Sequence, residues 1–356
     1  MQDAESRNGK TGKAEGARVK DDVLKKEMSR RDFIKAVAAG ATGLTAIAVL
    51  GSASYENSEG SAGKNGSQVS AAGSSRVYMT ADISARGLMA VYKRLGITVS
   101  GKVAIKLHMG ERGNTNYLRP ELLRDLAAEV KGSFVDSNTY YGGGRGTTQG
   151  HLAVAKEHGF TFAPVDILDA DGDTKLPVTG GKQLKEAIVG AHILNYDWII
   201  SVAHFKGHSL AGFGGSFKNM AVGIASPAGK GILHSNAGGG RFSSTGEPFF
   251  EKVIEYNKAL LDAKPGKILF INVLNNLSIS CDCDGNAPKS TIADIGILAS
   301  LDPVALEKAS LDQIYARPVS ERRSLVERIE SRGGVYQITY AEKIGLGTQN
   351  YELVNA

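Results

Sequence analysis

The sequence predicts an α/β protein, built on a largely parallel sheet with helices on both faces. Short apolar runs, typical of strands buried on both sides, recur along the chain. Segments with apolar residues at helical spacing separate these runs, as in proteins that alternate strands and helices. Glycine accounts for 44 of the 356 residues, which indicates many tight turns between elements.

The folded domain is expected to comprise residues 76–356, and its elements follow from the local patterns in chain order. Apolar runs predict strands at residues 102–108, 133–136, 164–167, 197–203, 267–273 and 295–299. Helical spacing predicts helices at residues 120–131, 147–158, 183–189 and 303–315. The first and last of these helices begin with proline, which is favoured in the first turn of a helix.

The first 53 residues have the pattern of an export signal. Two arginines, Arg30 and Arg31, precede Phe-Ile-Lys, an apolar run at 36–50 and small residues at 51–53. This order indicates a twin-arginine signal, which predicts the twin-arginine machinery as a partner and a periplasmic or otherwise extracytoplasmic protein, exported folded. The apolar run is too short to cross a bilayer, so no stable membrane span is expected after cleavage.

Two further features concern the same end of the chain. Met28 stands directly before the signal motif, so either Met1 or Met28 fits as the start of translation. Residues 54–75 are rich in glycine and serine and are expected to form a flexible linker.

The charge of the chain argues against nucleic-acid binding. The formal net charge is +5, but residues 1–53 hold ten lysines and arginines against seven acids. The remainder is nearly neutral and has no cluster of basic residues with interleaved aromatics. We therefore expect no nucleic acid among the partners.

Polar residues follow the predicted strands, where α/β proteins bind ligands beyond the carboxyl ends of their strands. We predict catalytic roles for three of them. Lys106 and Lys206 would orient a substrate anion, and Asp302 would position a lysine or act as a base.

Glycine-rich segments supply candidates for anion binding. Residues 141–148 contain three consecutive glycines and Arg145, and they form either an anion-binding nest or a flexible loop that begins a helix. A second glycine-rich turn precedes Lys218 and Asn219, which suit carboxylate or phosphate recognition. Residues 223–230 imitate a phosphate-binding P-loop but have the wrong glycine spacing, which argues against nucleotide hydrolysis.

Cys281 and Cys283, with an aspartate after each, form the most unusual motif in the sequence. They could bind a soft or borderline metal, act as a redox pair, form a strained disulfide or remain inert. The flanking acids are expected to raise the pKa of both thiols.

Histidines complete a predicted transition-metal site with Cys281 and Cys283. The candidates are His204, His208 and His234, of which one or more would be a ligand. In an extended strand His204 and His208 would lie roughly 13 Å apart. They could therefore share an ion only if the chain turns after Lys206, and each is otherwise a structural histidine.

Several blocks together resemble the domain-of-unknown-function family 362. They are VAIKLHMGE at 103–111, AHFKGH at 203–208, GFGGSFKNMAVG at 212–223, CDCDGN at 281–286 and DIGILASLDPVALEKASLD at 294–312. The resemblance implies an α/β fold over residues 76–316 and, in many members, an iron–sulfur association through an added segment of four or more cysteines. That segment is absent here, so a ferredoxin-type cluster is not expected. The functional positions that the resemblance implies are Lys106, His204, Lys206, His208, Lys218, Asn219, Cys281, Cys283 and Asp302.

Two functions of different classes are compatible with these features. The first is an exported metal- or cofactor-dependent enzyme, an oxidoreductase or isomerase acting on a small anionic substrate. The second is a non-catalytic extracytoplasmic protein that binds a metal or a small anion.

Overall fold

The computed structural model describes residues 74–356. The predicted twin-arginine signal and nearly all of the predicted linker lie outside the described residues. Within the described part of the chain, no helix is long and apolar enough to cross a membrane.

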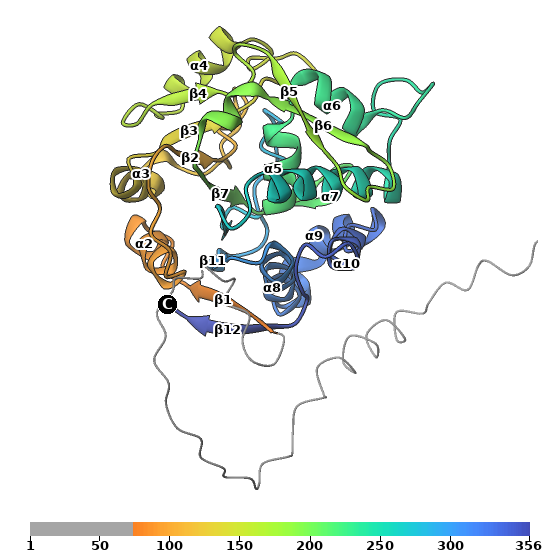
Figure 1. The fold of residues 1–356 in the computed structure, drawn as a ribbon. Helices are drawn as coiled ribbons and strands as arrows, with labels where there is room; N and C mark the ends of the chain where they lie inside the picture. The colour runs from red at the N-terminus through yellow and green to blue at the C-terminus, as the bar shows by residue number, and fades with distance from the viewer. Residues whose placement is uncertain (1–73) are drawn as a thin grey trace, which may run out of the picture. The chain divides into compact units, whose positions relative to one another are not determined.

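Eight strands form the central sheet, in the order β12-β1-β11-β10-β7-β2-β3-β4 (Figure 1). Strand β11 pairs antiparallel with β10 and β1, whereas the other neighbours in the sheet pair in parallel. The prediction of a largely parallel sheet is therefore confirmed. The strands are β1 (Ser75–Thr80), β2 (Val103–Lys106), β3 (Ser133–Asp136), β4 (Val165–Ile167), β7 (Trp198–His204), β10 (Ile268–Leu274), β11 (Gly296–Ser300) and β12 (Tyr351–Asn355).

The order of the strands reverses between β2 and β7. From β2 the chain proceeds outward through β3 to β4, and it then returns to β7 on the other side of β2 before it continues to β10. Such a reversal leaves a crevice at the carboxyl ends of the two central strands, where ligands bind in open α/β sheets. Lys106 is the last residue of β2, and His204 is the last residue of β7.

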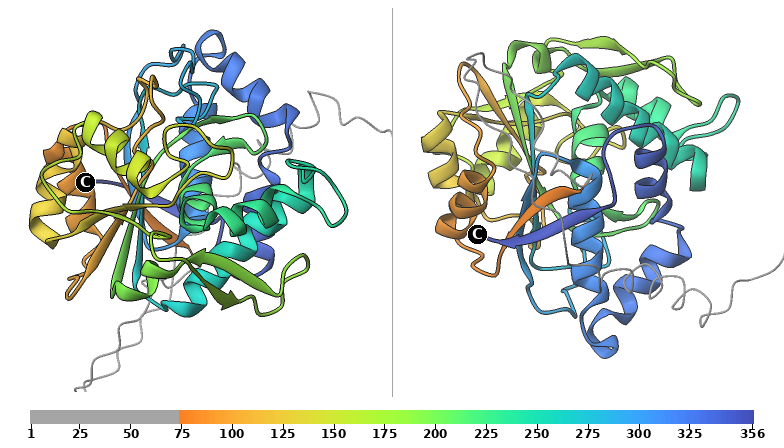
Figure 2. Two further views of the ribbon diagram at one scale, coloured as in Figure 1. Left: turned by 90° about the horizontal axis from the view of Figure 1, so that it is seen from above. Right: turned by 60° about the horizontal axis from the view of Figure 1, so that its bottom comes forward.

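Helices cover both faces of the sheet, as predicted (Figure 2). Residues of β7 alternate between two apolar cores, with Ile200 and Val202 in one and Ile199 in the other. The first core is formed with α2 (Ala85–Arg94), the 3-10 turn η1 (Pro120–Leu123), α3 (Arg124–Val130) and α4 (Thr148–Glu157). The second is formed with α5 (Ser216–Ile224), α7 (Gly246–Ala263), α8 (Pro303–Tyr315), α9 (Val319–Ser331) and α10 (Tyr336–Lys343).

The helix predicted at residues 183–189 is wrong. Strand β6 (Glu186–Gly190) occupies this segment and pairs antiparallel with β5 (Asp173–Pro177). Ala187 and Val189 are buried and Ile188 between them is less so, which is the alternation of a strand. The segment is too short for its periodicity to distinguish the two structures, and the pairing with β5 decides between them.

Shorter elements surround the carboxyl ends of the parallel strands. Strand β8 (Lys206–His208) follows β7 after one residue and pairs antiparallel with β9 (Gly212–Gly214). Helix α6 (Pro227–His234) follows α5, and a loop joins it to α7. The turn η2 (Ala191–Asn195) precedes β7.

Candidate functional site

A cavity of about 340 Å³ lies at the carboxyl ends of β2, β3 and β8. Five lysine and arginine side chains line it, which is a high density of positive charge for a cavity of this size. The charged and titratable residues of its wall are Lys106, His108, Asp136, Tyr141, Arg145, Lys206, His208, Lys218, Lys230, His234 and Cys283.

Asp136, at the end of β3, is the ion-pair partner of two of these cations. Its carboxylate lies 3.0 Å from Nζ of Lys106 and 3.3 Å from Nη1 of Arg145. Burial raises the pKa of Asp136, but the Lys106 ammonium and His151 outweigh burial and hold the pKa well below its usual range. Asp136 is therefore a buried anion that keeps two cationic side chains at the edge of the cavity.

Lys106 is held by a complete set of acceptors. Besides Asp136, its ammonium donates to the carbonyl of Leu107 at 2.9 Å and to Oδ1 of Asn219 at 3.0 Å. A β carbon at Gly223 would lie 2.3 Å from Nζ of Lys106, so glycine is required there. Burial lowers the pKa of Lys106. All three N–H groups are used, which makes Lys106 a fixed charge of the wall.

The anion-binding roles predicted for Arg145 and Asn219 find little free donor capacity. Arg145 donates from Nε to Glu111 and from Nη2 to Tyr141, and Nη2 also lies 3.2 Å from His108. The amide of Asn219 donates to the carbonyl of Lys106 and to Ser201. Both residues line the cavity, but their polar atoms stabilise its wall.

Lys218, the third predicted anion-binding residue, differs from these two. It projects from the first turn of α5 and lines the cavity. Within residues 74–356 it makes no hydrogen bond and no ion pair. Its charge is therefore available to a ligand.

Asp282 forms the second buried charge cluster. Its carboxylate oxygens lie 2.9 Å from Nδ1 of His204 and 2.9 Å from Nζ of Lys206. Burial raises the pKa of Asp282, but His204 and Lys206 outweigh burial and lower it. Burial likewise lowers the pKa of Lys206, and the carboxylate of Asp282 more than restores it, so the pKa lies above its ordinary value.

His204 is not available to a metal. Its Nε2 lies 2.6 Å from the carbonyl of Asn275, and its Nδ1 is occupied by Asp282. Both ring nitrogens thus face oxygen acceptors, and the metal-ligand role predicted for His204 does not fit this geometry.

His208 does meet both cysteines. A ring nitrogen of His208 and the two sulfur atoms of Cys281 and Cys283 all lie within 4.8 Å of one another. The close approach depends on Gly207, because a β carbon there would lie 2.5 Å from the carbonyl oxygen of Ile279. Gly207 also donates its N–H to the carbonyl of Ser278 at 2.7 Å, which ties β8 to the cysteine loop.

The two thiols have opposite electrostatic environments. A hydrogen bond from Cys283, assisted by Lys218 and His208, holds the pKa of Cys281 well below its usual range despite burial. The same hydrogen bond and burial raise the pKa of Cys283. The expectation that flanking acids raise both values is wrong for Cys281, because the hydrogen bond from Cys283 and the nearby Lys218 and His208 lower its pKa instead.

His208 presents Nε2 to the thiols. Its Nδ1 accepts hydrogen bonds from the backbone N–H groups of Leu210 and Ala211, at 3.2 and 3.0 Å. Burial lowers the pKa of His208 to about 4, so the ring is neutral near pH 7 and carries its proton on Nε2. Coordination through Nε2 requires that this proton moves to Nδ1 or leaves.

Residues of α6 form the opposite part of the wall. Nδ1 of His234 lies 2.8 Å from the carbonyl of Lys230, which leaves Nε2 as its free nitrogen. Burial lowers the pKa of His234 to about 4. His234 lies outside the group that His208 forms with the cysteines, so it is not a ligand of the same ion.

Lys230 was not among the predicted site residues. Its ammonium donates to the carbonyls of Asn138 and Ala225 at 2.7 Å and points toward that of Ser137 at 3.4 Å. Burial lowers its pKa to about 7. Two sequence signals could have indicated it: its place at the end of the P-loop-like block at residues 223–230, and its position on a mostly apolar helix.

Asp302 lies outside the site. It follows β11, the antiparallel strand, so it lies at the opposite edge of the sheet from Lys106 and His204. Its carboxylate caps α8 by accepting from the N–H groups of Val304 and Ala305. The same carboxylate also accepts from the hydroxyl of Ser75 and the N–H of Thr348. This position and these contacts do not fit the catalytic role predicted for Asp302.

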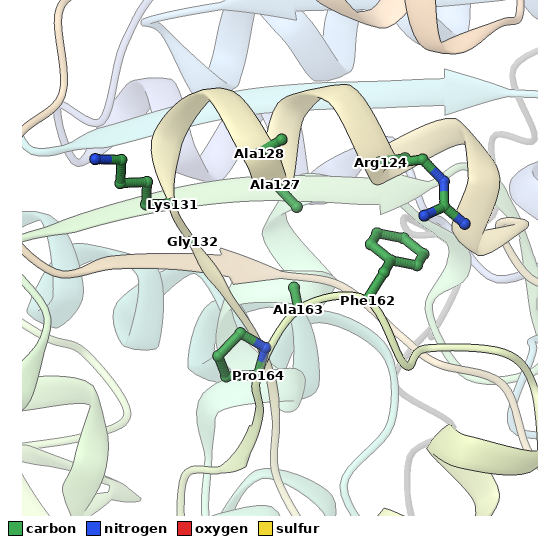
Figure 3. Close-up of a pocket in the computed structure, with 8 residues that line it drawn as sticks. All are labelled: Arg124, Ala127, Ala128, Lys131, Gly132, Phe162, Ala163 and Pro164. Carbon is green, nitrogen blue, oxygen red and sulfur yellow. The ribbon is translucent and has the colours of Figure 1, made fainter.

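A second cavity, of about 380 Å³, lies at the other edge of the sheet, before β3 and β4 (Figure 3). Small and apolar side chains dominate its lining. The guanidinium of Arg124 lies 4.2 Å from the centre of the Phe162 ring. Its lining holds no acid, thiol or imidazole, so the chemistry of the protein is expected at the first cavity.

Fold and site together define a doubly wound α/β protein with a cation-lined cavity and a cluster of two thiols and an imidazole. The chain belongs to the family described as domain of unknown function (DUF362), which matches residues 103–312, more than half of the chain. A search of curated proteins found no relative.

Two solved structures are similar to parts of the chain. One is the lactate racemase apoprotein from Thermoanaerobacterium thermosaccharolyticum, with 16% sequence identity and a TM-score of 0.33, which covers 55% of this chain and 50% of that one. The other is a protein from Thermotoga maritima, with 11% identity and a TM-score of 0.38, which covers 70% of this chain and 58% of that one. The chain thus spans half the length of the first structure and 58% of the second.

Proposed function

We propose that this protein is a metal-dependent enzyme that transforms a small anionic substrate. The observation that carries the proposal is the meeting of His208, Cys281 and Cys283 next to a cavity lined by cations. Two thiolates and an imidazole suit soft or borderline transition metals. Such a centre could polarise a bound anion in oxidoreductase or isomerase chemistry, and the proposal includes both.

The three donors fit a metal at a modest cost. If the proton of His208 moves from Nε2 to Nδ1, Nδ1 can no longer accept the hydrogen bonds from the N–H groups of Leu210 and Ala211. Each such hydrogen bond is worth about 0.5–1.5 kcal/mol. Structural zinc sites bind with about 10–16 kcal/mol, so metal binding outweighs this loss. The lowered pKa of Cys281 reduces the cost of releasing its proton to a metal.

His234 and the lysines supply the remaining functional groups. The neutral ring of His234 has a free Nε2 on the cavity wall, where it can accept a proton from a substrate. Lys206 holds its charge at the same wall through Asp282 and would orient the substrate anion. Lys106 supplies a second fixed charge next to it.

The test is the metal content of the mature protein, purified without oxygen, with an optical spectrum. We expect one equivalent of a transition metal in the wild type and none in Cys281→Ser/Cys283→Ser. Ser280→Ala, a neighbouring change in the same loop, is the control and keeps its metal. A wild type without metal, or a double variant that retains it, refutes the proposal. A metal-loaded protein that binds anions without turnover supports the non-catalytic binding protein instead.

Export is part of the same proposal. It is supported by Arg30 and Arg31 and by the apolar run that follows them. In a bacterium with a twin-arginine pathway, the wild type should reach the periplasm, and Arg30→Lys/Arg31→Lys should remain in the cytoplasm. Equal export of both proteins contradicts a twin-arginine route.

A further inference from the structure

The charges of the cavity are unevenly paired. Three of its five basic side chains lie within 4 Å of a carboxylate: Lys106 and Arg145 contact Asp136, and Lys206 contacts Asp282. Arg145 also pairs with Glu111, so three carboxylates face these three cations and the pairs add little net field. The two remaining cations, Lys218 and Lys230, have no carboxylate partner within the described part of the chain.

Lys218 is the more open of the two. It is partly buried on the cavity wall, and its ammonium has no acceptor in residues 74–356. A side chain that is mostly removed from water and makes no hydrogen bond or ion pair within the described residues loses hydration, which the nearby sulfurs of Cys281 and Cys283 offset only in part. A ligand anion would supply the missing partner.

Lys230 approaches the cavity from α6. It is buried, and two of its N–H groups are committed to the carbonyls of Asn138 and Ala225 at 2.7 Å. The third points to the carbonyl of Ser137 at 3.4 Å, a weak contact. This N–H can turn to an anion in the cavity while the other two keep the ammonium in place.

We propose that the substrate is a small dianion, held by Lys218 at one end and Lys230 at the other. The inference rests on the proposed function and names the class of its substrate. Two lysines without a carboxylate partner on one cavity match two negative groups on one ligand, as in a short dicarboxylate or a phosphate ester, and an anion next to Lys230 would favour its charged form. The volume of about 340 Å³ lies at the lower end of ligand-binding cavities, which restricts the ligand to a small molecule.

Aromatic residues form one part of the cavity wall. Phe242 lines the cavity and packs edge-on against Tyr140, with ring centres 5.9 Å apart, and against His234 at 5.4 Å. Arg241 lies over the Tyr140 ring at 4.3 Å and donates to its backbone carbonyl. Aromatic side chains in the wall would strengthen the attraction between the lysines and an anion where they exclude water.

The experiment compares dianions with a monoanion by calorimetric titration at pH 7 and constant ionic strength. The probes are malonate, inorganic phosphate and propionate. Each extra charge-assisted contact is expected to strengthen binding by about tenfold, so malonate or phosphate should bind at least about tenfold more tightly than propionate. A stronger preference for malonate indicates a dicarboxylate substrate, and one for phosphate indicates a phosphate ester.

Two variants assign the preference to its residues. Lys218→Met should reduce the advantage of the dianion to less than about threefold, and Lys230→Met should do the same where its thermal unfolding shows that it folds. Lys289→Met, which removes an exposed lysine outside the cavity, should leave the preference unchanged. Equal binding of dianion and monoanion by the wild type, or an unchanged preference in Lys218→Met, overturns the inference.

The metal measurement separates this inference from the proposed function. A protein that holds its metal but does not prefer dianions refutes the inference alone. A metal-free protein that prefers dianions through Lys218 refutes the metal-dependent function and supports the assigned anion site.

Discussion

Replacing Asp282 by asparagine tests how much its buried ion pair stabilises the folded protein. The change keeps the size of the side chain and removes its negative charge. In the wild type both carboxylate oxygens face donors, Nδ1 of His204 and Nζ of Lys206, each at 2.9 Å. An amide has one oxygen and one NH₂ group, so in the variant one donor must face another donor.

The structure sets the size of the effect. The side chains of Asp282 and His204 are fully buried, and that of Lys206 is 8% exposed. Removing one partner of a buried ion pair costs about 3–5 kcal/mol, because the other charge stays buried without compensation. At roughly 2–4 °C per kcal/mol, the midpoint of thermal unfolding should fall by roughly 6–20 °C.

The assay is thermal and urea unfolding of wild type and Asp282→Asn, with and without a chelator so that a change in metal content is recognised. Asp262→Asn is the matched control. Its carboxylate contacts Lys258 at 3.0 Å on the surface, where such a pair is worth about 0–1 kcal/mol.

The dependence on pH provides a second check. The pKa of Asp282 is lowered in the folded protein, so its contribution to stability is present above the pKa of the unfolded chain and is lost as the pH falls. The difference between wild type and variant should be largest near pH 7 and should shrink below about pH 4. A difference under about 1 kcal/mol at pH 7 would refute the buried-pair argument.

Three further predictions concern other groups around the cavity. Burial raises the pKa of Glu307 to about 7, so wild type should lose stability between pH 5 and pH 8 while Glu307→Gln does not; parallel urea-unfolding curves would contradict this. Gly223→Ala places a β carbon 2.3 Å from Nζ of Lys106 and should lower the unfolding temperature by several degrees, whereas Gly240→Ala, with no neighbour within 4 Å, should not. Since the pKa of Lys230 is about 7, malonate affinity should fall as the pH rises from 6 to 8, and in Lys230→Met titrations should show a flatter dependence.

Runs of apolar residues predicted the central strands because such runs mark segments that are buried on both faces of a sheet. Strand β7 is buried at every position, and in the sequence it is a mainly apolar run with Ser201 in the middle. Strands β1 and β12 were not predicted because both are partly exposed, β12 at the edge of the sheet and β1 beside it, and lack that signal. Residues 183–189 were assigned wrongly because so short a segment does not show its pairing with β5.

The location of the site was predictable, since polar residues at the ends of parallel strands converge. The direction of a single strand was not predictable, and Asp302 was misplaced because β11 runs antiparallel. Whether each cation is already paired with an acid was equally impossible to predict from the sequence. Arg145 belongs to a glycine-rich loop that suggests anion binding, yet Asp136, at the end of the preceding strand, and Glu111, farther away in sequence, already bind it.

The alternation in residues 281–284 explains how one short segment serves both clusters. In this tetrapeptide the sulfurs of Cys281 and Cys283 approach His208, while the carboxylate of Asp282 turns to His204 and Lys206. The buried carboxylate therefore pairs with one residue from each of β7 and β8, while the pKa of Cys281 is lowered by its other neighbours. If the ligand is the proposed dianion, removing the charge of Asp282 would leave Lys206 unpaired beside Lys218 and Lys230, and the cavity would then favour a ligand with one more negative charge. The proposed dianion thus depends on the acid between the cysteines as well as on the two lysines.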